Sequence, residues 1–157
     1  MIMNSEIRVR ISKEYTQVYD SVRKGLNIEA HVLFFVCFCF AVSKRLEPIE
    51  IQNREDKFWS RTIAPQEWTA IYTFFLDKNN MNLKAIEDDE VVIRQAERYA
   101  NAGMKLFLDE LPKDFIRTID EKQSIVASDK GETIKALLFA LISANYEQEN
   151  RDEDFTS

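Results

Sequence analysis

Residues 6–12 alternate strictly between polar and apolar side chains, with a β-branched residue at every second position. A period of two is typical of a half-buried strand, because successive side chains point to opposite faces. The pattern predicts a short N-terminal strand that turns its aliphatic side chains inward and leaves Arg8 and Arg10 on its open face.

Two helices are predicted to follow this strand. Residues 13–24 carry apolar side chains at helical spacing, with Ser12 before them as an N-cap and Gly25 after them as a C-cap. Asn27 can then cap a second helix over residues 28–46.

The centre of the second helix, residues 32–42, is apolar on every face. Eleven residues are too few for a membrane span, which needs about 20, so we expect a buried core helix. A chain of this size buries such a helix most easily by oligomerising. The expected oligomer core is Val32, Phe35, Val36, Phe38 and Cys39.

The rest of the chain is predicted to be helical, with residues 47–63 as a connector. Pro65 suits the first position of a helix whose apolar face runs to Leu76, and residues 88–90 supply a cap and first-turn acids for a helix over 90–111. A short helix over 112–118, a helix over 132–147 and a polar acidic tail complete the prediction. The fold class is mainly α: a short N-terminal β-strand followed by a helical bundle. The expected domain covers residues 1–111, and residues 112–157 form a helical extension packed on it.

Composition and charge narrow the alternatives. Only 3 Gly and 3 Pro occur in 157 residues, too few for the turns of a β-sandwich or barrel. The net charge of −6 argues against a protein that coats nucleic acid non-specifically. Residues 1–61 hold 10 Lys/Arg and 8 Asp/Glu, net +2, so this segment is the better candidate for contact with a polyanion.

Candidate catalytic chemistry is sparse. Cys37 and Cys39 are two residues apart in a predicted helix and therefore point about 200° from each other, so they cannot share a metal. His31 stands alone, and no glycine-rich phosphate loop occurs. We expect no enzyme, no metal and no cofactor. Because no signal peptide or membrane span is visible, we expect a cytoplasmic protein without membrane contact.

A basic strand followed by two helices is the order of a ribbon-helix-helix protein, in which paired strands of two subunits enter the major groove. In that geometry Arg8 and Arg10 would face DNA. An edge strand with two solvated arginines explains the same pattern, and the pattern alone slightly favours this second interpretation.

Several short motifs occur in a fixed order along residues 6–111: Arg8-Val-Arg-Ile-Ser-Lys13, Leu26-Asn-Ile28, Val32-Leu33, Phe38-Cys-Phe-Ala-Val42, Trp59-Ser-Arg-Thr62, Tyr72, Asp89-Glu90, Arg94-Gln95 and Gly103-Met-Lys-Leu-Phe-Leu108. In this order they resemble the DndE family of DNA sulfur-modification proteins. The chain departs from the family at Phe34-Phe35 and at Asn101-Ala102, where the family tends to carry basic residues. Residues 112–157 have no counterpart that we can place.

The resemblance implies a small, mostly helical, tetramer-forming protein without catalytic chemistry of its own. It would act in bacterial DNA phosphorothioation, binding double-stranded DNA, nicked DNA included, beside other subunits of the sulfur-modification machinery. The expected DNA contacts are Arg8, Arg10, Lys13, Arg23 and Lys24. The alternatives are a protein–protein adaptor of a phage-defence complex without DNA binding, and a ribbon-helix-helix transcription regulator.

Overall fold

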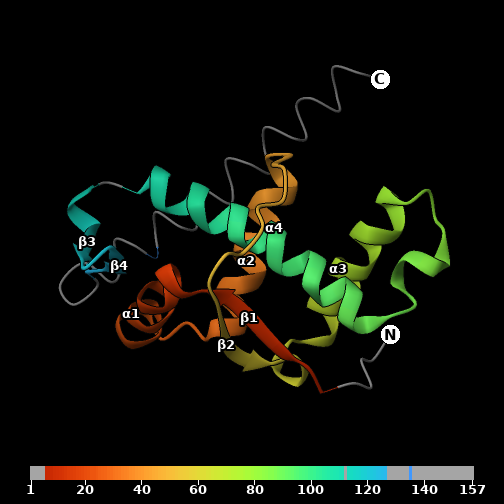
Figure 1. Ribbon diagram of the computed structural model, residues 1–157, viewed down its shortest axis with the longest axis horizontal. Helices are drawn as coiled ribbons and strands as arrows, with labels where there is room; N and C mark the ends of the chain where they lie inside the picture. The colour runs from red at the N-terminus through yellow and green to blue at the C-terminus, as the bar shows by residue number, and fades with distance from the viewer. Residues whose placement is uncertain (1–5, 112, 127–134, 136–157) are drawn as a thin grey trace.

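The computed structural model describes residues 6–111, 113–126 and Lys135. The chain is mainly α with a short N-terminal strand, as predicted, and the initial order of strand, helix and helix is confirmed. In Figure 1, α4 crosses α2 near the centre of the molecule, and β1 and β2 lie along one side. The elements are β1 (Arg8–Ser12), η1 (Lys13–Tyr15), α1 (Thr16–Leu26), α2 (Ala30–Ser43), β2 (Arg54–Trp59), η2 (Ser60–Thr62), α3 (Pro65–Lys78), η3 (Leu83–Ile86), α4 (Asp89–Glu110), η4 (Lys113–Phe115), β3 (Ile116–Ile119) and β4 (Lys122–Ile125).

α2 and α4 approach each other closely where they cross in the core. At Gly103 of α4, a Cβ atom would lie 1.7 Å from the carbonyl oxygen of Cys37 in α2. No residue with a side chain fits there without moving one of the two backbones. Gly103 therefore fixes the distance between the helices, and Cys37 is fully buried beneath it.

Aromatic side chains from three helices fill the space beside this crossing. The ring of Phe38 lies 5.6 Å from that of Phe74, 6.1 Å from that of Phe75 and 6.2 Å from that of Tyr99, measured between centroids. These are the edge-on and tilted arrangements that aromatic rings prefer. Phe38 is therefore buried in the core of its own chain, and within the single chain its ring contacts α3 and α4.

The predicted connector over residues 47–63 contains a strand. β2 pairs antiparallel with β1, with an irregularity between Val9 and Arg10. Sequence periodicity missed β2 because its centre is the charged run Glu55-Asp56-Lys57. Two of these side chains bind α1 instead of facing solvent: Glu55 accepts from the Thr16 hydroxyl, and Lys57 Nζ lies 2.5 Å from Asp20 Oδ1.

Helix ends follow the predicted sites in part. Asp88 caps α4, since its Oδ1 accepts hydrogen bonds from the backbone N–H groups of Glu90 (2.9 Å) and Val91 (3.4 Å), and Pro65 begins α3. Between α1 and α2 the prediction was wrong. Gly25 is helical, and Asn27, expected to begin the next helix, ends α1 in the left-handed conformation with a φ of 56°.

The chain after α4 differs from the predicted helix over 112–118. Lys113–Phe115 form a single 3-10 turn, and β3 and β4 then form a hairpin around Asp120 and Glu121, both at positive φ. The hairpin packs on α1, where the Ile125 N–H donates to Ser21 Oγ at 2.9 Å. The predicted helix over 132–147 and the acidic tail lie outside the described residues, apart from Lys135.

Candidate nucleic-acid interface

Arg8 and Arg10 lie on the open face of β1, as the alternation predicted, and share one carboxylate. Asp56 of β2 lies 3.9 Å from Arg8 Nε and 3.5 Å from Arg10 Nε, measured to its nearer oxygen in each case. Both arginine side chains remain about one-third exposed, at 34% and 35%. The face is therefore basic but partly neutralised by the neighbouring strand.

Trp59, the last residue of β2, has two guanidinium groups close to its ring. The guanidinium carbon of Arg8 lies 4.8 Å from the centroid of the indole ring, and that of Arg61 lies 5.5 Å from it. Both distances fall within the range of cation–π attraction. Arg61 also pairs with Glu6 at 2.8 Å. We call these three residues the Arg8–Trp59–Arg61 column, which places two cations beside one aromatic ring at one end of the two-stranded sheet.

Sequence reasoning did not assign contacts to Trp59, Arg61 or Asp56. Trp59 was noted only as a point of resemblance, and the spacing of Trp59 and Arg61 is too common to indicate stacking. The only available signal was the strand itself: had β2 been recognised, its pairing with β1 would have placed Trp59 beside Arg8.

The remaining predicted contacts are not gathered at this column. Lys13 is exposed directly after β1. Arg23 and Lys24 are exposed in the last turn of α1, and at 1.5 Å per residue Lys24 lies roughly 12 Å along the helix from Thr16. Arg23 also pairs with Glu29 at 3.8 Å. The predicted set is therefore spread along the N-terminal third of the chain.

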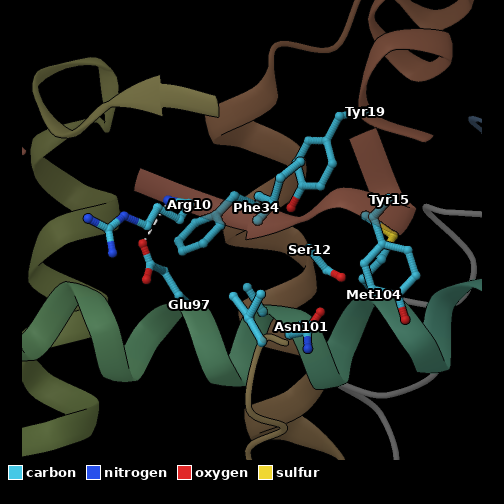
Figure 2. Close-up of a pocket in the computed structure, with 11 residues that line it drawn as sticks. Arg10, Ser12, Tyr15, Tyr19, Phe34, Glu97, Asn101 and Met104 are labelled. Carbon is cyan, nitrogen blue, oxygen red and sulfur yellow. Dashed lines mark hydrogen bonds between the residues drawn. The ribbon is translucent and has the colours of Figure 1, made fainter. Parts of the chain in front are cut away.

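The second edge of β1 is covered by side chains of α4. The Arg10 N–H donates to Glu97 Oε2 at 2.7 Å, and Arg94 Nη1 donates both to the Arg8 carbonyl at 3.1 Å and to the same Glu97 oxygen at 2.7 Å. Figure 2 shows Glu97 pointing up from α4 toward the Arg10 backbone. Burial raises the pKa of Glu97, and the contacts with Arg10 and Arg94 oppose that rise.

This coverage bears on the ribbon-helix-helix alternative. Such proteins pair the N-terminal strand with its copy in a second subunit. Here one edge of β1 pairs with β2, and on the other edge the Arg8 carbonyl and the Arg10 N–H are bonded to Arg94 and Glu97. The described residues therefore leave no open edge of β1 for a second strand, although the order of elements matches.

The expected oligomer residues other than Phe38 lie on the side of α2 that faces away from Gly103. Val32 is 38% exposed, and Phe35, Val36 and Cys39 are half-buried. At 100° per residue these positions cluster opposite Cys37. His31, in the first turn of α2, lies 3.4 Å from Glu67 Oε1 of α3 through its Nδ1. We call Val32, Phe35, Val36 and Cys39 the outward face of α2.

The thiols of Cys37 and Cys39 lie on different sides of α2, as their spacing predicted, but burial affects both in the same way. Burial raises the pKa of both, above the ordinary range for Cys37 and to about 11 for Cys39, where the negative charge of Glu67 adds to the effect. Both are therefore protonated at neutral pH and are poor nucleophiles. Among the described residues, no three His, Cys, Asp or Glu side chains are arranged to hold a metal ion.

Comparisons with protein-family models, with curated proteins and with solved structures find no match for this chain. Within residues 6–111 and 113–126, no single helix is long and apolar enough to cross a membrane. Residues 13–26 and α2 together have the necessary length and apolar composition, but the chain bends by 115° between them.

Proposed function

We propose that the protein is a non-catalytic, DNA-binding accessory subunit of a bacterial DNA sulfur-modification system, acting in the cytoplasm. The observation that carries the proposal is the Arg8–Trp59–Arg61 column beside Arg10, on an exposed face of the sheet. Guanidinium groups pair with phosphates, and the aromatic ring holds two of them in place. The ordered resemblance to the DndE family supplies the biological setting.

Binding to the duplex is expected to be weak, sensitive to salt and tolerant of sequence. A few arginines per subunit neutralise few phosphates, and the affinity of backbone binding falls with salt in proportion to that number. A homo-oligomer would repeat the set and strengthen binding by presenting several copies at once. Nicked duplexes are expected to bind at least as well as intact ones, because a nick lets the DNA bend toward the protein.

Self-association through the outward face of α2 is part of the proposal. This face holds only apolar side chains and a thiol, with Val32 more than one-third exposed. Burying it between subunits removes apolar area from water, at about 25 cal/mol per Å². A tetramer is the form expected from the resemblance.

A protein–protein adaptor of a phage-defence complex is the second candidate, and one contact favours it. Asp56 already neutralises Arg8 and Arg10, and the whole chain carries a charge of −6. The two candidates differ in one measurable respect: only the first requires affinity for DNA.

The experiment measures binding to intact and nicked duplexes by fluorescence anisotropy across a range of low salt concentrations. Replacing Arg8 and Arg10 by Ala should weaken binding and lower the slope of log affinity against log salt by about one per lost phosphate contact. The charge-matched control, Lys44→Ala with Arg45→Ala, alters two exposed residues outside the predicted interface and should leave the slope unchanged.

Asp56→Asn should change the affinity for DNA in the opposite direction. Removing the shared carboxylate frees both arginines, so the variant should bind more tightly than Asp77→Asn, an equal change of charge at an exposed site on α3. If neither the wild type nor Asp56→Asn binds any duplex at low salt, the adaptor function replaces DNA binding.

A further inference from the structure

A second cluster of arginines surrounds a cavity that the proposed function does not use. The cavity has a volume of about 220 Å³ and lies between α4 and the segment that leads into β2. Its lining is Glu50, Ile51, Arg54, Arg94, Glu97 and Arg98. Three guanidinium groups and two carboxylates give the lining an excess of one positive charge.

Glu50 bridges the two arginines at the rim. Its Oε1 lies 3.5 Å from Arg54 Nη2, and its Oε2 lies 3.2 Å from Arg98 Nε. Close charge-assisted hydrogen bonds of this type measure about 2.7–2.9 Å, so both contacts are loose. All three side chains are about half exposed. The Glu50 carboxylate therefore occupies the position between two arginines without holding either tightly.

The inner wall of the cavity is fixed. Glu97 is only 4% exposed and binds Arg94 and the β1 backbone. The segment that carries Glu50 is tied to the same helix, since the Ile49 N–H donates to the Arg98 carbonyl at 3.1 Å and Asn101 Nδ2 donates to the Ile49 carbonyl at 3.3 Å. The rim arginines are thus presented by anchored backbone.

We propose that this cavity is a binding site for a phosphate group, and that Glu50 is an internal competitor for it. Both rim nitrogens lie within 3.5 Å of one carboxylate, so a single phosphate in its place would contact both arginines. A phosphate dianion carries more charge than a carboxylate and offers oxygens to both guanidinium forks at once. Displacing Glu50 also raises the positive excess of the remaining lining to two.

The phosphate has two sources with the same chemistry: a free phosphate ion, or the terminal monoester of a nucleic acid. The cavity is larger than the volume of one water, about 30 Å³, by enough to admit a phosphate together with part of an attached group. The site does not rest on the proposed function, because that interface uses Arg8, Arg10 and Trp59.

The first experiment titrates inorganic phosphate into the protein by calorimetry, in a phosphate-free buffer of low ionic strength. Glu50→Gln should bind phosphate about tenfold more tightly than wild type, because the competing charge is gone. Glu47→Gln, an equal change of charge at an exposed neighbour, should match wild type. Arg54→Gln with Arg98→Gln should abolish saturable binding, whereas Lys44→Gln with Arg45→Gln should not.

The second experiment separates the two sources by competition on the Glu50→Gln variant. Displacement of phosphate by a 5′-phosphorylated oligonucleotide, but not by its 5′-hydroxyl counterpart, identifies a terminal monoester; displacement by neither identifies free phosphate. Arg8→Ala with Arg10→Ala should keep phosphate binding, so failure of the DNA interface leaves this site standing. Absence of saturable binding in Glu50→Gln, or equal affinity in wild type and the Arg54/Arg98 variant, would overturn the proposal.

Discussion

The inward face of α2 packs against α4 so closely that the Cys37 carbonyl occupies the space a side chain at position 103 would need, whereas Val32 on the outward face is 38% exposed. Both faces are equally apolar. The inward face is satisfied by the chain itself, so changes there should cost stability. The outward face is only partly covered, so changes there should act on association. Mutations on the two faces should therefore separate folding from assembly.

The largest effect is expected at Gly103. Alanine normally stabilises a helix relative to glycine by roughly 0.5–1 kcal/mol, but a Cβ here would lie 1.7 Å from the Cys37 carbonyl oxygen. Gly103→Ala should therefore lower the free energy of unfolding by about 3 kcal/mol or more, the scale of overpacking in a rigid core. Urea denaturation followed by circular dichroism measures this change.

Gly25→Ala is the matched control for the Gly103 variant. Gly25 is helical, exposed and without a positive φ. Its replacement should stabilise the protein slightly, in line with helix propensity. Equal effects of the two substitutions would contradict the close crossing of α2 and α4.

Phe38 should show the next largest effect. Its ring contacts Phe74, Phe75 and Tyr99 within the chain, and it is 2% exposed. Phe38→Ala should cost about 3–5 kcal/mol of stability. Phe38→Asp should prevent folding, because it adds an unpaired buried carboxylate to the lost contacts. A folded Phe38→Asp subunit, seen in the near-ultraviolet circular dichroism spectrum, would place Phe38 outside the core.

Substitution of Phe35 should affect assembly more than folding, the reverse of the result expected for Phe38. It is one helical turn from Phe38 but lies on the outward face and is half-buried. Phe35→Asp should dissociate the oligomer and should cost the subunit less stability than Phe38→Asp, because Phe35 is only half-buried, although its ring lies 6.4 Å from that of Phe38. Sedimentation velocity at micromolar concentration measures the oligomeric state of the wild type and of the variant. A wild type that is already monomeric there would rule out assembly through this face.

The sequence predicted the elements whose ends and faces are marked locally. The helix beginning at Pro65 and the helix capped by Asp88 each have one apolar face and an identifiable start, and both formed as predicted. α2 has no polar face, so nothing in its own pattern distinguishes Phe35 from Phe38. That distinction comes from Gly103, which is distant in sequence and draws one side of α2 against α4.

The candidate sites were less predictable than the helices, because they too depend on contacts between residues that are distant in sequence. Arg8 and Arg10 were found because alternation places them on one face of β1. Their shared partner Asp56 and the stacked Trp59 come from a strand that the charged run concealed. Arg54 and Arg98 meet at one carboxylate although 43 intervening residues separate them in the chain, and no local pattern indicates such a meeting.

The smallest effect expected is a difference in thiol chemistry between the two faces. Burial raises the pKa of Cys39 to about 11, so the thiolate fraction should still rise about tenfold per pH unit between pH 8 and pH 10. For a freely exposed thiol, whose pKa is about 8.5, the rise of the thiolate fraction would flatten above pH 9. Maleimide labelling of the native protein, read by mass spectrometry, should therefore modify Cys39 slowly with no plateau in this range, and should leave Cys37 unmodified until the protein unfolds. If the outward face associates, labelling of Cys39 should also slow as the protein concentration rises. Labelling of Cys37 at the rate of Cys39 would show that the two faces of α2 are not distinct.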